Sequence, residues 1–558
     1  MKKIPIGIDD YKELIEKGYA YVDKTLFIQE IIDRGTKIAI IPRPRRFGKT
    51  INMSTLKYFF EKTKEDNSHL FSPYNIWKTK HRESQGKFPV IFLTLKEIKQ
   101  ETWELAYESF KALIAEEYEK HRYLLNSAEL SPDEKEIFHT ILKQQANQAN
   151  TERSLKYLVW WLDRYHREKV IVLIDEYDSP IHMAYFYGYY SHIINFMRNW
   201  LGGGLKSNNS LERGVVTGIL RIAKENIFSD LNHSSNFTSF SGDFGDKFGL
   251  LEEEVYSLLK DYDMSAKLEE VRNWYNGYHI ALHSVYSPWS ILNYIQYKTL
   301  KPYWINTSGN ELIKEQLIQK GMFFKEDFES LILGKTITKR IDEGLVFASL
   351  KNSKEAIWGL LLFSGYLTLS TTPVLDGILY SCELKIPNQE IAALFHSIIQ
   401  DYFEETFFDT WSDLLNALIT GDVETFSEGF QEIIMDMFSS HDISKKAPER
   451  VYHAFVLGLL VSLRKTHEIK SNRESGLGRF DLCLFPKNLN DLGIILEFKK
   501  AKKEEFEKKD LEKLANSAIL QIENLHYVTE LKHRGVQKIL ALGMAFQGKQ
   551  VFIRDKLL

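Results

Sequence analysis

Four short apolar runs in the first 220 residues constrain the fold of this chain more than any other feature. They are KIAIIP (37–42), FPVIFLTL (88–95), KVIVLIDE (169–176) and RGVVTGIL (213–220), and long stretches with helical spacing separate them. Each run is apolar at consecutive positions, whereas a strand with one face in water would alternate apolar and polar residues. We therefore predict an α/β fold in which helices cover both faces of a parallel sheet, with right-handed crossovers.

The length of the chain adds further domains to this sheet. A chain of 558 residues is too long for a single hydrophobic core. Residues 1–250 contain the four runs, with a helical insertion at 101–162 between the second run and the third. Residues 251–445 are mostly helical with aromatic clusters, which predicts a lid or middle domain. Residues 446–558 combine helices with strands, which predicts a C-terminal α/β domain.

Local patterns predict the elements of the later regions. GYLTLS (365–370) and ILYSCELKIP (378–387) predict a strand pair, and the amphipathic segment from Asp413 predicts two helices with their turn at Gly421-Asp422. The C-terminal region is expected to contain a helix at 449–465, strands at 478–485 and 492–500, a charged helix from Lys502 and a closing strand pair at 538–546 and 549–554.

Composition excludes several classes of protein. With 44% hydrophobic and 27% charged residues the chain is globular, and a net charge of -4 gives no reason to expect a surface for nucleic acid or membrane beyond a local patch. Cys382 and Cys483 are too few for a disulfide framework or a four-cysteine zinc site. Acidic residues interrupt the N-terminus before a signal peptide could form, and no run approaches the ~20 apolar residues of a membrane span. We expect a cytoplasmic protein without a membrane partner.

The first predicted strand leads directly into a sequence that fits a phosphate-binding loop. The segment RPRRFGKT (43–50) follows the strand and precedes a helical pattern, as in a Walker A motif. In such a loop, backbone N–H groups and a helix N-terminus surround the phosphates. We expect Lys49 to bridge the β and γ oxygens and Thr50 to bind Mg²⁺. The other residues assigned to the nucleotide site are Arg46, Phe47 and Gly48.

One position departs from the usual motif. Arg43 stands where the first glycine is expected, so the turn has to form without a residue that readily adopts positive φ, and Pro42 and Pro44 are candidates for fixing it. The alternative interpretation is an accidental GKT tripeptide at the end of a strand.

Polar residues follow the third and fourth predicted strands. Asp175 is expected to hold the Mg²⁺ shell, and Glu176 to polarise the attacking water. Thr217 is placed to sense the γ-phosphate, although it could instead cap a helix. Arg221 is either a phosphate sensor or part of a surface ion pair. Acids at strand ends are usually solvated turn residues, so the prediction depends on their combination with the GKT loop.

A second group of charged residues occurs near the C-terminus. In IILEFK (494–499), the period of two in a strand places Glu497 and Lys499 on one face, and an antiparallel neighbour would bring Asp481 alongside. Two carboxylates suit Mg²⁺, and an ammonium group beside them can orient the attacking water. The alternative is a strand that emerges into solvent. Three further candidates are Glu449 as a third acid, Gln521 as a contact to substrate phosphate or to the site lysine, and Arg479 as a nucleic-acid contact.

These two groups, in this order and at these distances, resemble a bacterial and archaeal family that joins an AAA-ATPase-like domain to a C-terminal nuclease domain of the PD-(D/E)XK superfamily. The resemblance covers almost the whole chain. In this family the loop typically reads RPRRFGK, so Arg43 matches the family pattern. The segments that carry the resemblance are YVDKT (21–25), RPRRFGKT (43–50), LIDEYDSP (173–180), TGILRIAKENIFSDLN (217–232), WYNGY (274–278), VYSPWSILNYI (285–295), FSGYLTL (363–369), IPNQE (386–390), ESGLGRFDL (474–482), ILEFK (495–499) and AILQI (518–522).

The resemblance implies a P-loop NTPase domain with ATP and Mg²⁺ as cofactors, followed by a restriction-endonuclease-like domain. It implies phosphate and Mg²⁺ binding by Lys49 and Thr50, with Asp175 as the Walker B acid and Glu176 as the catalytic base. The implied nuclease core is Asp481, Glu497 and Lys499, with Glu449 and Gln521 on the flanking helices. The chemistry of the YVDKT signature does not follow from its residues, and we expect the signature near the nucleotide base.

Two functions remain open from the sequence. The leading hypothesis is an ATP-binding and hydrolysing protein coupled to an Mg²⁺-dependent nuclease that acts on nucleic acid, DNA in the first place, in defence or mobile-element biology. The alternative is a nucleotide-dependent switch or scaffold whose nuclease-like domain binds nucleic acid or protein without cleaving. The intact D…ExK set favours the first. The choice between ATP and GTP and the oligomeric state, a homo-oligomer included, are not determined.

Overall fold

The chain forms two compact units. The first comprises Met1–Ile313 and Thr336–Ile391, and the second comprises Lys314–Lys335 and Ala392–Leu558. The predicted division at residues 250 and 445 stays a prediction. The computed structural model describes residues 1–206, 208–220, 234–280, 283–304, 325–332, 334–344, 355–395, 408–437, 465–475, 478–501, 508–547 and 550–558, with the single positions 350, 353, 397, 456, 460 and 463.

A five-stranded parallel sheet lies at the centre of the first unit, in the order β2-β3-β4-β1-β5. All residues of β1 and β3 are buried, which explains their uninterrupted apolar sequence. The predicted parallel α/β sheet is thus confirmed. The short edge strand β5 was not predicted, because its three residues, Ser-Ser-Asn, form no apolar run. The strands are β1 (Ile38–Pro42), β2 (Val90–Thr94), β3 (Val170–Asp175), β4 (Leu211–Gly218) and β5 (Ser234–Asn236).

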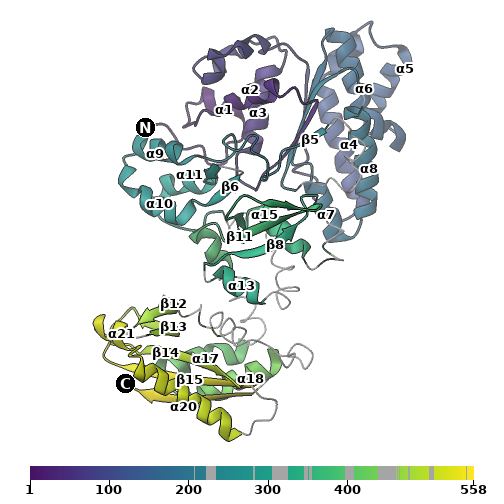
Figure 1. The fold of residues 1–558 in the computed structure, drawn as a ribbon. Helices are drawn as coiled ribbons and strands as arrows, with labels where there is room; N and C mark the ends of the chain where they lie inside the picture. Colours follow the sequence, from purple (N-terminus) through teal and green to yellow (C-terminus); the bar gives the residue numbers. More distant parts are fainter. Residues whose placement is uncertain are drawn as a thin grey trace. The chain divides into compact units, whose positions relative to one another are not determined.

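Helices pack around this sheet (Figure 1). The expected insertion between β2 and β3 consists of α4, α5 and α6, and α8 packs beside α6. The α-helices are α1 (Tyr11–Glu16), α2 (Leu26–Asp33), α3 (Lys49–Phe60), α4 (Trp103–Lys120), α5 (Pro132–Leu142), α6 (Gln148–His166), α7 (Ser179–Tyr187) and α8 (Tyr190–Leu205). Short 3-10 helices occur at η1 (Ser68–Leu70), η2 (Asn75–Lys78), η3 (Lys80–Ser84), η4 (Arg122–Asn126) and, later in the chain, η5 (Ser265–Lys267).

The rest of the first unit mixes helices with small antiparallel sheets. The predicted strand pair is confirmed, because β9 pairs with β11, and β11 also pairs with β8 and β10. A separate hairpin joins β6 to β7. The elements are α9 (Glu252–Asp261), α10 (Leu268–Tyr275), β6 (Tyr278–Ile280), β7 (His283–Val285), α11 (Pro288–Tyr297), β8 (Ile337–Ile341), α15 (Ala356–Ser364), β9 (Thr368–Leu369), β10 (Val374–Asp376) and β11 (Leu379–Lys385).

Glu390 is a carboxyl group buried in this part of the first unit. Its exposed fraction is 0%, and it accepts hydrogen bonds from the backbone N–H of Trp304 at 2.6 Å and the hydroxyl of Ser290 at 2.8 Å. Burial raises the pKa of Glu390 to about 7, and these hydrogen bonds only partly oppose it. The carboxyl group therefore keeps its proton in the folded protein at pH values where the unfolded chain has lost it.

This difference in pKa predicts how stability depends on pH. Because the folded state binds the extra proton between about pH 4.5 and 7, the free energy of unfolding should fall as pH rises through this window, by roughly 3 kcal/mol. Glu390→Gln cannot ionise and should lack this decline. Thermal unfolding of both proteins at pH 5, 6, 7 and 8 measures it. Parallel pH profiles of the two proteins would contradict the assignment.

The second unit is built on a mixed sheet in the order β12-β13-β14-β15-β16, in which only β14 and β15 are parallel. The predicted strand pairs and the helical pair with its turn at Gly421-Asp422 are confirmed; β12 was missed because HEIKSNRES is polar. The predicted helix at 449–465 lies largely outside the described residues. The elements are α13 (Lys325–Ile332), α17 (Phe408–Thr420), α18 (Val423–Met437), β12 (His467–Ser475), β13 (Gly478–Pro486), β14 (Gly493–Lys500), α20 (Lys508–Asn524), α21 (Thr529–His533), β15 (Ile539–Gln547) and β16 (Gln550–Leu557).

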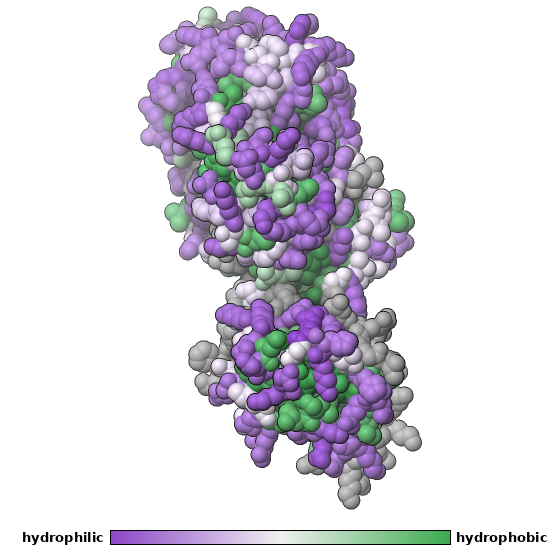
Figure 2. All heavy atoms as spheres, turned by 90° about the vertical axis from the view of Figure 1, so that its left-hand side faces the viewer, coloured by the Kyte–Doolittle hydropathy of each residue, from purple (hydrophilic) through white to green (hydrophobic). Residues whose placement is uncertain are grey.

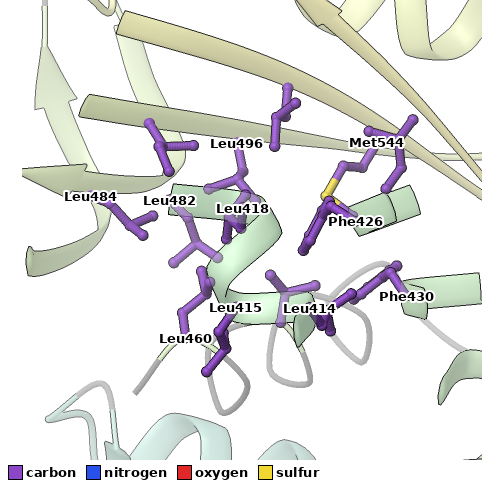
Figure 3. Packing of buried hydrophobic residues seen from close by; sticks show 14 of the residues in the cluster. Leu414, Leu415, Leu418, Phe426, Phe430, Leu460, Leu482, Leu484, Leu496 and Met544 are labelled. Carbon is purple, nitrogen blue, oxygen red and sulfur yellow. The ribbon is translucent and has the colours of Figure 1, made fainter. Parts of the chain in front are cut away.

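Helices cover both faces of this sheet. On one face, apolar side chains of α17 and α18 pack against the sheet, as with Leu418 and Phe426 against Leu496 (Figure 3). On the other, α20 lies directly on β15, because a Cβ added at Gly543 would come within 2.2 Å of the Ala515 carbonyl oxygen. This close approach fixes the distance between α20 and the neighbouring strand β14.

None of the helices that the structure describes combines the length and the apolar composition that a membrane span requires. On the face shown in Figure 2, hydrophilic residues predominate on the first unit and apolar residues form only small groups there. Such scattered apolar residues are normal on folded proteins.

Candidate active sites

The segment between β1 and α3 forms a tight loop at the edge of the parallel sheet. Gly48 caps α3 with a φ of 82°, and Arg46 has a φ of 66°. Arg43 is not among the residues with positive φ. The turn therefore forms without a left-handed residue at the position where the usual motif has its first glycine, as the sequence required.

The side chain of Arg43 is wholly buried and holds the base of the loop. Its guanidinium donates hydrogen bonds to the carbonyl oxygens of Phe237 at 2.5 Å and Asp243 at 3.0 Å, and it lies over the ring of Phe248 at 5.2 Å. Burial lowers the pKa of Arg43 to about 9. The residue that replaces the glycine thus ties the loop to the segment after β5.

Four predicted residues converge below the loop. The Lys49 ammonium donates to the carbonyl oxygens of Arg43 at 3.2 Å and Pro44 at 3.0 Å. The hydroxyls of Thr50 and Thr217 donate to the two carboxylate oxygens of Asp175, at 2.7 and 2.5 Å. Burial lowers the pKa of Lys49 and raises that of Asp175, whose two hydroxyl partners oppose the rise. Thr217 acts here as a hydrogen-bond donor to Asp175.

The turn after β3 brings two further acids beside them. Glu176 has a φ of 52°, which is uncommon for a residue with a side chain. Asp178, which the sequence reasoning missed, accepts hydrogen bonds from the backbone N–H groups of Ile219 at 2.9 Å and Leu220 at 3.0 Å. Burial raises the pKa of Asp178. These contacts hold the end of β4 against the turn.

A cavity of about 520 Å³ opens in front of this group. Its volume lies in the range of small-ligand sites. Five predicted residues line it, namely Arg46, Gly48, Lys49, Thr50 and Glu176. Phe47 instead packs edge-on against Tyr278, with ring centroids 4.9 Å apart. Arg221 lies outside the described residues.

Several lining residues were not found from the sequence. Lys96 and Lys99 follow β2, and a search of all strand ends at the carboxyl edge of the sheet would have found them. Trp289 and Tyr366 reach the cavity from α11 and from the turn after α15, and local patterns carry no signal for that. The guanidinium of Arg46 lies 4.2 Å from the centre of the Trp289 ring, which holds it at the cavity wall.

The YVDKT signature does not line this cavity. Asp23 accepts hydrogen bonds from Thr25 and from the backbone N–H of Asn75, and the ammonium of Lys24 donates to both oxygens of Glu254 at 2.7 Å. These contacts join the start of α2 to η2 and α9.

The second predicted site forms where β13, β14 and α20 meet. Leu482 pairs with Leu496, which places Asp481 beside Glu497, and Asp481 accepts a hydrogen bond from the Phe498 backbone N–H at 2.8 Å. Gln521 bridges the predicted residues: its carbonyl oxygen accepts from the Lys499 ammonium at 2.6 Å, and its amide group donates to the Glu497 carboxylate. The Lys499 ammonium also lies 3.4 Å from Glu497 Oε1. Asp481, Glu497, Lys499 and Gln521 are thus brought together.

Glu497 is the most constrained group of this site. Burial and then the nearby Asp481 carboxylate raise the pKa of Glu497 to about 8, against the effect of Lys499. Its Oε2 atom is buried and has no hydrogen-bond partner among the described residues. An unpartnered carboxylate oxygen beside a second carboxylate is a donor set that fits a hard divalent cation.

Two predicted members of this site are not described. Glu449 lies outside the described residues, and of Arg479 only the backbone is described, in β13 opposite Glu474. Within the described residues, no group of three or more His, Cys, Asp or Glu side chains is arranged to hold a metal ion. The described part of the site therefore supplies two carboxylates.

Two segments of the chain match models of domain families, and each segment contains residues of one candidate site. Residues 5–228 match a family model described as a predicted AAA-ATPase, and residues 447–556 match a model of the PD-(D/E)XK nuclease superfamily. The chain joins an AAA-ATPase-like domain to a PD-(D/E)XK nuclease superfamily domain. The cavity is lined partly by the AAA-ATPase-like domain, and the Asp481 site belongs to the nuclease superfamily domain. These domains support ATPase and nuclease-like function.

A relative has the same extent. A protein of Azotobacter chroococcum mcd 1, described as "Uncharacterized protein in vnfD 5'region", is 24% identical over 566 residues, which cover 98% of this chain and 96% of that protein. The similarity therefore spans both domains, although the description of this relative assigns no activity.

Proposed function

We propose that this protein binds and hydrolyses ATP and that the nucleotide controls Mg²⁺-dependent cleavage of nucleic acid, DNA in the first place. The observation that carries the proposal is the convergence of Asp481, Glu497 and Lys499 on Gln521 within the nuclease superfamily domain. The phosphate-binding loop on the same chain supports the nucleotide half of the proposal.

In the AAA-ATPase-like domain, the N-terminus of α3 and the Lys49 ammonium would bind the triphosphate. The first-turn N–H groups of a helix have no partner within the helix and point at such an anion. Lys49 would exchange its present carbonyl acceptors for phosphate oxygens. Thr50 and Asp175 would hold Mg²⁺, which neutralises charge that develops on the phosphates. Glu176 would accept a proton from the attacking water, and Arg46, which lines the cavity, would contact the phosphates.

In the nuclease domain, Asp481 and Glu497 would hold Mg²⁺. The ion would supply charge neutralisation at the scissile phosphate and a lowered pKa for the attacking water. The Lys499 ammonium would orient that water, and Gln521 would keep Lys499 in place through the contact at 2.6 Å. Water would attack phosphorus and give up a proton to solvent, while the bond between phosphorus and the leaving oxygen breaks and the leaving oxygen takes up a proton from solvent.

The switch or scaffold remains the competing function. A wide separation of Asp481, Glu497 and Lys499 would favour the switch or scaffold. In the structure, Lys499 and Gln521 both contact Glu497 instead. A cytoplasmic location and a setting in defence or mobile-element biology stay predictions.

Cleavage assays on the full chain test the proposal. Linear, circular and single-stranded DNA, and RNA, are incubated with Mg²⁺, with and without ATP or GTP. We expect cleavage of at least one DNA form that requires Mg²⁺ and changes in rate with ATP, and chelation of the ion should stop it. If every substrate stays intact in Mg²⁺ and ATP, the nuclease half of the proposal is wrong.

A further inference from the structure

Three consecutive carbonyl groups of the phosphate-binding loop are held from outside the loop. Each accepts a hydrogen bond from a different part of the segment at 249–304. The donors are Gly249 N at 3.1 Å to Phe47, Ser287 Oγ at 3.5 Å to Arg46 and Trp304 Nε1 at 3.0 Å to Arg45. A change in the conformation of the loop therefore has to be accommodated by these donors.

Trp304 is connected in turn to the buried Glu390. The Trp304 backbone N–H donates to Glu390 Oε1 at 2.6 Å, while Ser290 of α11 donates to Oε2 at 2.8 Å. Trp304 is 1% exposed and packs edge-on against Tyr366, with ring centroids 5.1 Å apart. The Glu390 carboxyl group thus accepts hydrogen bonds both from α11 and from Trp304, whose indole contacts the loop.

Trp304 and Glu390 also lie close to the points where the chain passes from the first unit into the second. The chain leaves the first unit after Ile313 and again after Ile391, and the two residues lie shortly before these points. Their hydrogen bond joins the two segments that continue into the second unit. The contact also requires a buried carboxyl group, which costs free energy relative to an apolar pair.

Nucleotide binding would change the hydrogen bonds of the phosphate-binding loop. In the structure the Lys49 ammonium donates hydrogen bonds to the carbonyl oxygens of Arg43 and Pro44. Phosphate oxygens would compete for this ammonium and release those carbonyls. A ligand shifts an equilibrium between two conformations only when it binds them with different affinity. Two arrangements of the loop that differ in their hydrogen bonds would be such conformations.

We propose that Trp304 and Glu390 are positioning residues that transmit the state of the phosphate-binding loop to the two chain segments leading into the second unit. The inference rests on the proposed function, since it specifies how nucleotide would regulate the nuclease. A movement of the Arg45 carbonyl displaces the Trp304 indole, and the Trp304 backbone carries the displacement to Glu390. Neither residue lines the cavity, so both act through the loop.

Three variants of the full chain test the pathway. Glu390→Ala removes both acceptors, Trp304→Phe removes the indole donor to the loop, and Glu390→Gln retains a carbonyl acceptor. We expect the first two to reduce the effect of ATP on the cleavage rate by about tenfold or more, with the ATP hydrolysis rate nearly unchanged, and Glu390→Gln to preserve coupling. Tyr118→Phe is the control, because it removes one buried hydrogen bond, to the Ser154 carbonyl, in the helical insertion.

Hydrogen exchange supplies a second readout that does not need nuclease activity. In the wild type, a non-hydrolysable ATP analogue should slow amide exchange at residues 386–392, and Glu390→Ala and Trp304→Phe should lose this protection. Unchanged coupling in Trp304→Phe and Glu390→Ala would overturn the inference, as would an analogue that binds the wild type without protecting these residues. If Glu390→Ala does not fold, Trp304→Phe and Glu390→Gln decide the matter. If the wild type cleaves nothing, the proposed function fails, while the exchange data still test the pathway.

Discussion

Lys49→Ala should abolish ATP hydrolysis, with a fall in kcat of about a thousandfold or more. The Lys49 ammonium is buried at the base of the loop and donates to two carbonyl oxygens of the loop itself, those of Arg43 and Pro44. Removing it leaves the triphosphate without its charge-assisted donor. Phosphate release measures hydrolysis, and a fluorescent nucleotide measures binding, which should also weaken.

A control separates this loss from unfolding. Lys57 lies on the same helix α3, contacts the ring of Tyr58 and does not line the cavity, so Lys57→Ala should hydrolyse ATP at the wild-type rate. Circular dichroism and thermal unfolding should find Lys49→Ala folded, because the substitution removes a charge whose burial is costly. A folded Lys49→Ala protein with normal hydrolysis would refute the assignment of this loop as the nucleotide site.

Glu497→Gln should abolish nucleic-acid cleavage, again by about a thousandfold or more. The substitution keeps the shape of the side chain and removes its charge, so the site loses one of its two described ligands for a divalent ion. Stability should change little, because burial already disfavours the charged form of Glu497 and the substitution exchanges a carboxyl group for a neutral amide of the same shape. Cleavage and thermal unfolding are measured on the same preparation, and a loss of cleavage without a loss of stability distinguishes a site residue from a structural one.

Two companions make this test specific. Asp481→Asn should fail in the same way, because Asp481 lies beside Glu497 in the sheet. Glu523→Gln is the matched control: Glu523 is on α20 near Gln521 but pairs with Lys556 at the surface. Cleavage at the wild-type rate by Glu497→Gln would refute the assignment of Glu497 to the centre that cleaves nucleic acid.

The sequence predicted those parts of the fold that local patterns determine. Consecutive apolar residues gave β1 to β4, and the strand period placed Glu497 and Lys499 on one face. The polar strands β5 and β12 escaped detection because edge strands need no apolar face. Trp289 reaches the cavity from a distant helix, and its arrival depends on tertiary packing that no periodicity encodes.

The contacts between site residues could be predicted from the sequence only in part. The sequence assigned Thr50 and Asp175 to one Mg²⁺ site from their places at the ends of predicted strands, and in the structure the Thr50 hydroxyl donates to Asp175 at 2.7 Å. The sequence offered Gln521 as a contact to the site lysine, and the structure has this contact. The second contact of Gln521, to Glu497, was not predicted, because it depends on how closely α20 approaches the sheet at Gly543.

Because of Arg43, the shape of the nucleotide loop depends on residues far from the loop in the sequence. Its guanidinium bonds to carbonyl groups 194 and 200 positions further along the chain, so the eight residues from 43 to 50 do not by themselves encode the shape of the loop. Grafting them onto another scaffold would transfer the lysine and the threonine without the support that positions them. Conversely, a substitution near residues 237–243 should change the conformation of the loop as directly as a substitution inside it.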